Sequence, residues 1–356
     1  MIYAVVPAWN EAKTIASTIA SLRAQTRPPD LIVVVPNNCT DRTAAVAREE
    51  GAYVVEVPGH NPYKKAGAIN YALDRIAPYL DHWAKASAVL IMDADTTLDP
   101  DFVAVAERHL CPGVGGVGGT FVGREAHNII GQCQRMEFFR YGRITQRFGY
   151  RAFVLTGTGT LFDWPALKAV RAARLAGRVL PCGKSYYDTR SLTEDNELTL
   201  ALQTIGYLST SPEGMGATTD IMDTPKKLIK QRERWYLGAL RNLNDYGSRL
   251  PWHLRWVYWR QQAGLLLSAF VIGTYLLMLA TTYLTGRSLS WSWWWAIPTG
   301  VLIVERTASV WPMGWRERLL AATFIPEQLY VGFLTYVYLR AALLFARGSR
   351  GGWTAT

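Results

Sequence analysis

The sequence predicts an α/β domain with a mostly parallel sheet, followed by amphipathic interface helices and about three C-terminal transmembrane segments. Three observations carry this prediction. Short apolar runs alternate with helical patterns up to Asp95. A basic and aromatic segment spans residues 226–262, and long uncharged runs begin only after it. Such alternation is typical of a parallel sheet with helices on both faces.

The composition limits the class of partner. The chain has 356 residues, a formal charge of +10 and 14 tryptophans. Because its basic clusters border apolar runs, they fit a membrane bilayer better than a nucleic-acid groove, and we expect no nucleic-acid partner. Its four cysteines are widely spaced and form no CxxC pair, which indicates reduced thiols that face the cytosol.

Strands and helices alternate through the first hundred residues. Apolar runs predict strands at 2–7, 31–35, 53–57 and 88–92. Apolar residues at helical spacing predict the intervening helices, which are 15–22, 44–50 and one that opens at 64. The carboxyl ends of parallel strands meet at one edge of a sheet, where α/β proteins bind ligands.

Two carboxylates one residue apart, Asp93 and Asp95, follow the fourth predicted strand. At that place they suit a hard divalent cation, which usually brings a phosphate. The pattern alone is weak evidence, because Asp99-Pro100-Asp101 repeats it at a helix start, where Asp99 suits a cap. A turn or capping role stays an alternative for the first pair.

Two glycine-rich segments have different interpretations. Residues 113–118 match G-x-G-x-x-G, but they follow a predicted helix and precede a strand-like segment, the reverse of the dinucleotide-binding context. We expect a flexible lead into a strand there. The turn at 155–161 can approach a sugar closely through three residues, Gly157, Thr158 and Gly159.

Two later motifs carry charge. Thr193-Glu194-Asp195 precedes a predicted helix at 196–204, where Thr193 suits a cap and acids are stabilised by the positive helix end. A carboxylate at a helix start can also act as a general base. The predicted basic helix at 226–246 contains Gln231-Arg232-Glu233-Arg234-Trp235, and 251–260 is expected in the headgroup plane or as a solvated helix.

The C-terminal part predicts membrane segments. Residues 263–284 carry no charge and are long enough to span a bilayer. Tryptophans at 291 and 293–295 predict an interfacial belt. Residues 296–304 are short for a span, and 319–345 predict an apolar helix broken near Pro326. The chain thus divides into a cytosolic domain, interface helices, a transmembrane region and a tail, at 1–225, 226–262, 263–346 and 347–356.

Taken in order, these motifs resemble the family 2 glycosyltransferases of GT-A fold. The similarity is greatest to the membrane-embedded branch with a D, DxD, TED, QxxRW pattern, which includes cellulose, chitin and hyaluronan synthases and ceramide glucosyltransferase. It covers roughly residues 1–260. The motifs that carry it are Pro7-Ala8-Trp9-Asn10-Glu11, Asp41, Lys65-Ala66-Gly67-Ala68-Ile69-Asn70, Asp93-Ala94-Asp95, Thr193-Glu194-Asp195 and Gln231-Arg232-Glu233-Arg234-Trp235.

The resemblance implies a UDP-sugar donor and an integral membrane enzyme with a cytosolic catalytic domain. Asp95 would bind Mg²⁺ or Mn²⁺, and Asp195, beside Glu194, would be the general base. Donor binding is implied for Pro7, Glu11, Asp41, Lys65, Asp93, Gln231, Arg234 and Trp235. Acceptor binding is expected of Gly157, Thr158 and Gly159, and is implied for Trp235. The chain departs from the family at Asn37-Asn38, where an acid is common.

The chemistry needs one base, because a single displacement inverts the anomeric carbon without a carboxylate nucleophile. We expect transfer of a glucose-type hexose or GlcNAc to a diacylglycerol, ceramide-like or polyprenyl lipid, giving a glycolipid. This preference rests on the absence of a membrane helix before the catalytic domain and on the few hydrophobic segments after it. A pore built by a homo-oligomer would instead permit a processive polysaccharide synthase. An inactive transferase-fold scaffold is disfavoured, because every motif acid is present.

Overall fold

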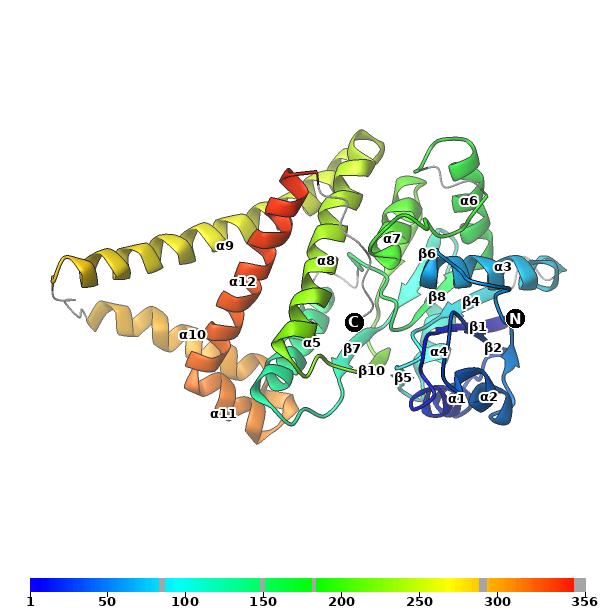
Figure 1. Ribbon diagram of the computed structural model, residues 1–356, viewed down its shortest axis with the longest axis horizontal. Coiled ribbons are helices and arrows are strands. Elements are labelled where there is room, and N and C mark those ends of the chain that lie inside the picture. Colours follow the sequence, from blue (N-terminus) through cyan, green and yellow to red (C-terminus); the bar gives the residue numbers. More distant parts are fainter. Residues whose placement is uncertain (83–86, 148–150, 181–183, 288–292, 349–356) are drawn as a thin grey trace. The chain divides into compact units, whose positions relative to one another are not determined.

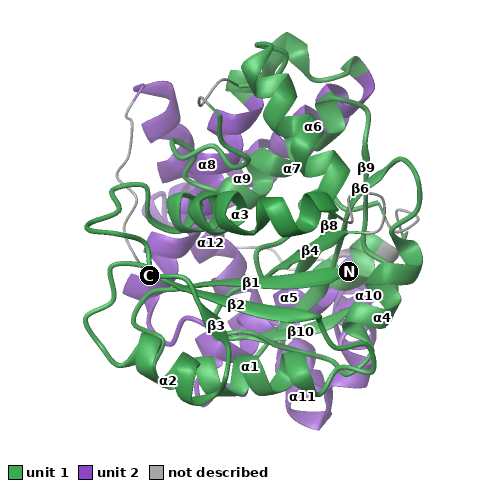
Figure 2. Cartoon of the chain, turned by 90° about the vertical axis from the view of Figure 1, so that its right-hand side faces the viewer, with its two compact units in different colours: residues 1–124, 141–220, 244–252 green, residues 125–140, 221–243, 253–356 purple. Residues whose placement is uncertain are grey.

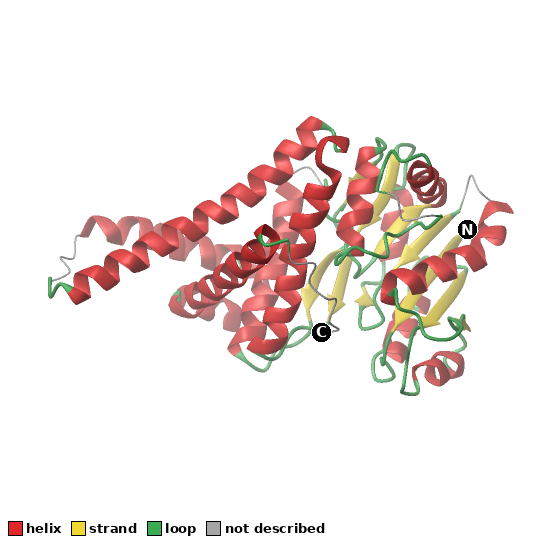
Figure 3. Cartoon of the chain, turned by 45° about the horizontal axis from the view of Figure 1, so that its top comes forward, coloured by secondary structure: helices red, strands yellow, loops and turns green. Residues whose placement is uncertain are grey.

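The computed structural model describes residues 1–82, 87–147, 151–180, 184–287 and 293–348 (Figure 1). The chain divides into two compact units, which are coloured separately in Figure 2. Unit 1 comprises residues 1–124, 141–220 and 244–252, and unit 2 comprises 125–140, 221–243 and 253–356. All strands of the described residues belong to unit 1 (Figure 3).

The main sheet of unit 1 has seven strands in the order β3-β2-β1-β4-β8-β6-β9. Neighbours among the first four strands are parallel, as are β6 and β9, whereas β8 runs antiparallel to both β4 and β6. The predicted mostly parallel sheet is therefore confirmed as part of a mixed sheet. The strands are β1 Ile2–Ala8, β2 Leu31–Pro36, β3 Tyr53–Val54, β4 Ala88–Ile91, β6 Val114–Gly118, β8 Thr160–Asp163 and β9 Leu208–Thr210.

A second sheet has three strands, and the first of them follows β4 along the chain. It is formed by β5 Thr97–Leu98, β10 Gly216–Thr219 and β7 Thr120–Gly123. Its central strand β10 is antiparallel to β5 and parallel to β7. Because β5 follows Asp95 closely, this small sheet fixes the chain directly after the paired carboxylates.

Helices cover both faces of the main sheet (Figure 2). One face carries α1 Ile15–Arg23, α2 Thr43–Glu49 and α4 Phe102–His109, and the other carries α3 Lys64–His82, α6 Trp164–Leu175 and α7 Glu194–Thr204. Alternate residues of a strand point to opposite faces, so the apolar residues at even positions of β1 form one core with α1 and α4.

The glycine-rich segment 114–118 is itself a strand, so the expected flexible lead into a strand was wrong. The strand forms because its missing side chains make room for neighbours. A Cβ on Gly116 would lie 2.7 Å from Leu155 Cδ1. The expected cap at Asp99 was also wrong, because α4 has Asp101 at its N-cap position.

Unit 2 is helical. Helices α5 Ile129–Arg147 and α8 Pro225–Tyr246 each contribute residues to both units. The remaining helices are α9 Trp252–Leu284, α10 Ala296–Ser309, α11 Trp315–Thr323 and α12 Ile325–Ala346. The predicted break near Pro326 is confirmed, since Phe324 has φ +63° between α11 and α12.

Two helices of the described residues, rather than three, are long and apolar enough to span a bilayer. Helix α9 has a mean hydropathy of 2.1 with 6% of its apolar window buried, and α12 has 1.6 with 22% buried. Neither is thus a core helix of this chain. The middle segment forms α10, whose 14 residues are too short. Trp291 and most of the predicted tail lie outside the described residues.

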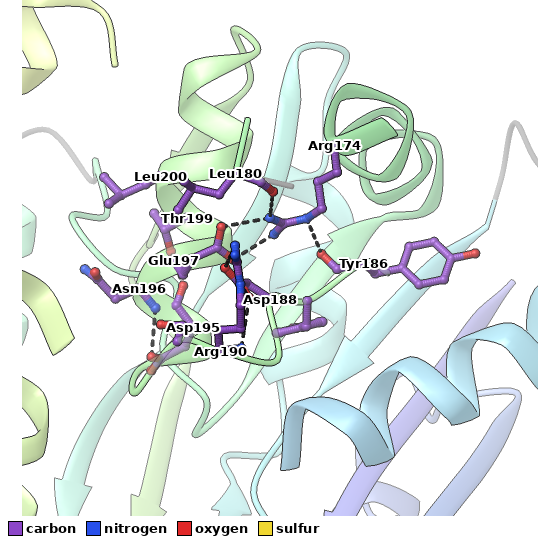
Figure 4. Close-up of polar contacts among 12 residues, drawn as sticks. Arg174, Leu180, Tyr186, Asp188, Arg190, Asp195, Asn196, Glu197, Thr199 and Leu200 are labelled. Atoms are coloured by element: carbon purple, nitrogen blue, oxygen red, sulfur yellow. Dashed lines mark hydrogen bonds and ion pairs between the residues drawn. The ribbon is translucent and has the colours of Figure 1, made fainter. Parts of the chain in front are cut away.

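A fully buried ion pair anchors α7 within unit 1 (Figure 4). Arg174 donates two hydrogen bonds to Glu197, at 3.0 and 2.7 Å, and both side chains are completely buried. Arg174 also donates to the carbonyls of Leu180 and Tyr186, and the hydroxyl of Tyr246 donates to Glu197. The pair is therefore saturated with hydrogen bonds, as buried charges require.

We expect Glu197→Ala to lower the free energy of unfolding by about 3–5 kcal/mol, because it leaves the Arg174 charge buried without its partner. Chemical denaturation of the two proteins measures the difference. The matched control is Glu49→Ala, which removes the exposed Arg42–Glu49 pair and should cost no more than about 1 kcal/mol. Equal effects of the two variants would contradict an anchoring role.

Candidate active site

Asp93 and Asp95 follow β4 directly, as the sequence predicts. The Asp93 amide donates to the carbonyl of Gly157 at 2.9 Å, which places the glycine loop beside the strand end. The Asp95 carboxylate accepts from the hydroxyls of Thr96, at 3.2 Å, and Thr219, at 3.4 Å. Both carboxylates are half-buried, so they remain accessible to a ligand.

Negative charge accumulates around Asp95. Burial, together with the charges of Asp93, Glu11 and Asp220, raises its pKa to about 7. Arg124 donates to the backbone carbonyl of Asp95, and its charge is paired with Asp220 at 2.6 Å. The Asp95 carboxylate thus sits among acids, an arrangement that a bound cation would relieve.

Lys65 joins the paired aspartates to the motif at 193–195. Its Nζ lies 2.6 Å from Asp93 Oδ1 and 3.0 Å from Glu194 Oε1. Burial acts to lower the pKa of Lys65, but the charges of Asp93, Glu194 and Asp195 outweigh it and raise the pKa well above its usual value. The lysine therefore stays protonated and bridges the end of β4 and the start of α7.

Asp195 lies in the first turn of α7, which begins at Glu194, two residues earlier than predicted. Its carboxylate accepts from the amides of Asn196, at 2.7 Å, and Gly157, at 3.3 Å. Burial raises its pKa, the Glu194 charge adds to the rise, and Lys65 opposes it. Thr193 occupies the N-cap position, but its side chain makes no capping hydrogen bond, so simple capping does not account for this motif.

Of the three loop residues predicted to bind the acceptor, Gly157 is the one that lies beside the acids. Gly157 lines a small pocket together with Lys65, Tyr187, Glu194 and Asp195. Thr158 and Gly159 are not among the residues that line this pocket, although Thr156 is. The Thr158 hydroxyl lies 2.8 Å from that of Thr156, and a Cβ on Gly159 would lie 2.9 Å from the Phe102 ring.

The predicted donor residues near the N-terminus form a second group. The Asp41 carboxylate accepts from the amides of Ala12, at 3.1 Å, and Thr43, at 3.0 Å. The Thr43 hydroxyl also accepts from the amide of Glu11 at 2.8 Å. Burial raises the pKa of Glu11, as do the charges of Asp220, Asp93 and Asp41.

Pro7 is buried within β1, two residues after Val5, which accepts the Met92 amide at the end of β4. Asn37 and Asn38, which depart from the family pattern, bind Asn61. Asn61 donates from its side chain to Asn37 at 2.7 Å and from its amide to Asn38 at 2.9 Å. The two amides thus hold the loop before α3, which is a structural role.

Gln231, Arg234 and Trp235 lie on α8 in unit 2, whereas the acids lie in unit 1. Within unit 2, the Arg232 guanidinium stacks 4.5 Å from the centroid of the Trp235 ring. Arg232 also pairs with Glu137 at 2.8 Å, and the Tyr330 hydroxyl donates to Glu137 at 2.6 Å. Trp235 is therefore held by a polar network that sequence reasoning missed.

Sequence reasoning also missed Arg124 and Asp220 in unit 1. Each follows the end of a strand in the small sheet, where a polar residue signals a ligand edge. The strand before Arg124 was expected as a strand-like segment, but its charge was not connected with the site. The strand before Asp220, Gly-Ala-Thr-Thr, is too short and too polar for an apolar run to reveal it.

The described residues contain no group of three His, Cys, Asp or Glu side chains arranged to hold a metal ion. Asp95, with acids around it, nevertheless fits Mg²⁺ or Mn²⁺. Mg²⁺ in particular usually takes only one or two protein carboxylates and completes its shell with waters and substrate phosphates. The residues present thus fit a cation that arrives with a phosphorylated substrate.

An α/β fold with carboxylates at the strand ends and an acid at a helix start is compatible with several enzyme classes, and sequence similarity assigns the chain to the glycosyltransferases. The chain belongs to Glycosyl transferase family group 2, which its residues 88–305 match. Residues 3–171 also match Glycosyl transferase family 2.

Curated relatives include poly-beta-1,6-N-acetyl-D-glucosamine synthases of Staphylococcus aureus strains COL and MSSA476. Each is 26% identical over 239 residues, which is 65% of this chain and 52% of the relative. The chain therefore spans about half the length of the curated relatives it matches.

Among solved structures, the chain resembles the mannosyltransferase PcManGT from Pyrobaculum calidifontis, in complex with GDP-Man and Mn²⁺. The TM-score is 0.65 at 18% identity, covering 98% of this chain and 87% of the other. Glucosyl-3-phosphoglycerate synthase from Mycobacterium tuberculosis, with Mn²⁺ and UDP-glucose, gives a TM-score of 0.41 at 19% identity, covering 68% and 79%. The first likeness supports the fold assignment.

We expect Gly157→Ala to weaken UDP binding about tenfold. The new Cβ would lie 2.7 Å from Lys65 Nζ and 3.2 Å from Asp93 Oδ2, so the flexible lysine must leave its carboxylates while the fold is kept. Calorimetry with UDP measures the loss. Gly332→Ala is the control, because no atom lies within 4 Å of its Cβ position. Unchanged binding by Gly157→Ala would separate the loop from the donor site.

Proposed function

We propose that this chain transfers a glucose-type hexose or GlcNAc from a UDP-sugar to a membrane lipid, with inversion at the anomeric carbon. The observation that carries the proposal is the placement of Asp195. Its carboxylate is held beside Gly157, its pKa is raised, and Lys65 links its neighbour Glu194 to Asp93 after β4. A base with a raised pKa beside a strand-end donor site suits transfer to a hydroxyl group.

In this mechanism Asp195 accepts the proton of the acceptor hydroxyl. Gly157 and Asn196 hold the carboxylate through their amides, so it needs no reorganisation when the proton arrives. The Lys65 ammonium lies between Asp93 and Glu194, where it offsets charge beside the donor. A divalent cation held by Asp95 would supply Lewis-acid stabilisation of the leaving diphosphate.

The donor side is assigned to Glu11 and Asp41 for the nucleoside, with Pro7 beside them and Asp93 supporting the nucleotide. Thr43 couples the first two of these residues, because its hydroxyl accepts the Glu11 amide and its own amide donates to the Asp41 carboxylate. Gln231, Arg234 and Trp235 are assigned to the diphosphate and the acceptor, and Gly157, Thr158 and Gly159 to the acceptor. A GDP-sugar is the second candidate donor, since PcManGT is described with GDP-Man.

A membrane lipid acceptor is supported by the two exposed apolar helices, α9 and α12. A bilayer around them would make the chain an integral membrane protein, with lipid hydroxyls within its environment. The second candidate function is processive polysaccharide synthesis by a homo-oligomer, which similarity to poly-beta-1,6-N-acetyl-D-glucosamine synthase favours. Because the catalytic acids and Lys65 are held in contact, an inactive scaffold is the weakest alternative.

The purified full chain, given radiolabelled UDP-glucose, UDP-GlcNAc or GDP-mannose with Mn²⁺ and lipid extract, should yield a labelled product that partitions into organic solvent. Asp195→Asn should lower product formation by about 10²–10⁴-fold while keeping UDP binding. Asp74→Asn, on the exposed face of α3, is the matched control and should leave turnover unchanged. A long water-soluble polymer would favour the second function, and an active Asp195→Asn variant would exclude this residue as the base.

Glu194→Gln should move the acidic limb of the pH profile of kcat/KM to lower pH. The base must be ionised, so activity rises as pH passes its pKa. The Glu194 charge raises that pKa, and its removal also leaves Lys65 to act more strongly on Asp195, so both effects lower it. Glu56→Gln, an exposed acid, should leave the limb in place. A limb that moves upward would contradict this electrostatic assignment.

A further inference from the structure

One buried hydroxyl joins the start of α7 to the glycine loop. The Thr199 side chain is fully buried, and its Oγ1 donates to the carbonyl of Asp195 at 2.7 Å. The same oxygen accepts the amide of Leu155 at 2.9 Å. Figure 4 shows Thr199 one turn after Asp195 on the same helix.

The glycine loop meets Asp195 a second time. Gly157, two residues after Leu155, donates its amide to the Asp195 carboxylate at 3.3 Å. The backbone of Asp195 and its carboxylate are therefore both tied to one short segment, the first through Thr199 and the second directly. Two attachments fix the distance and the orientation of the carboxylate, which one attachment cannot do.

We propose that Thr199 is a positioning residue for the base, whose hydroxyl sets the distance between Asp195 and the glycine loop. The inference rests on the proposed function and adds a residue outside the predicted motifs. A buried amide needs a partner, so the hydroxyl also satisfies Leu155, which no apolar side chain of the same shape can do.

The second bond distinguishes Thr199 from an ordinary helical threonine. Threonine hydroxyls in helices commonly donate to the carbonyl four residues earlier. Thr204, on the same helix, donates to Leu200 in this way at 2.7 Å. Thr199 makes the same bond and in addition receives an amide from another element. Thr204 is therefore a matched control for the helical bond alone.

The test compares Thr199→Val, Thr199→Ser and Thr204→Val in the whole chain of 356 residues. UDP release gives kcat and KM, and UDP calorimetry gives affinity and the number of binding sites, so that kcat is expressed per folded site. We expect Thr199→Val to lower kcat between about tenfold and about a hundredfold, with UDP affinity within twofold of wild type. Thr199→Ser should restore kcat to within threefold, and Thr204→Val should match wild type. Thr199→Ala removes the same hydroxyl and carries the same expectation if the valine variant does not fold.

A wild-type kcat per site in both Thr199→Val and Thr199→Ala would overturn the inference, because the hydroxyl would then only stabilise the fold. A serine variant no better than valine, or a loss of UDP affinity as large as the loss of kcat, would overturn it as well. A wild-type chain that releases no UDP overturns the proposed function, and with it the role of Thr199. Turnover by the wild type with an unaffected valine variant overturns this inference alone.

Discussion

The site depends on the two ion pairs that the Lys65 ammonium group forms. This group compensates two carboxylates that come from different parts of the chain, Asp93 after β4 and Glu194 at the start of α7. Two unit charges at about 4 Å interact by about 4 kcal/mol at the effective dielectric near a protein surface. Without the lysine, the charges of Glu194 and Asp93, which both raise the pKa of Asp195, would act on it without this opposing cation.

Two acids of helix α7 have different roles, one at the site and one in the protein core. Glu194 faces Lys65 and the donor side, whereas Glu197, one turn later, forms the buried pair with Arg174. The buried pair is hydrogen-bonded and neither of its residues lines the pocket beside Gly157, so it can fix the helix without using the acids of the pocket. The first turn of the helix, where Glu194 is buried and Asp195 is half-buried, can thus hold a carboxylate with a raised pKa.

The parts of the site that could be predicted are those marked by strong local patterns. The apolar run before Asp93 and Asp95 predicts a buried strand. The residue pattern around Glu194 and Asp195 predicts the start of a helix. Arg124 and Asp220 could not be connected with the site, because the pairing of β7 with β10 joins residues that are distant in the sequence, and β10 shows no apolar run. The antiparallel direction of β8 and the strand at 114–118 likewise depend on contacts between distant residues, such as Leu155 against Gly116.

Gly157 connects the end of strand β4 to the carboxylate on helix α7. Its carbonyl accepts the amide of Asp93 and its own amide donates to the Asp195 carboxylate, so the two acids are connected through one residue. A residue without a Cβ has the most permissive backbone, so the loop can change its conformation while both hydrogen bonds are kept. The two acids are thus coupled through main-chain groups of a flexible residue, and a shift at one of them can be shared with the other.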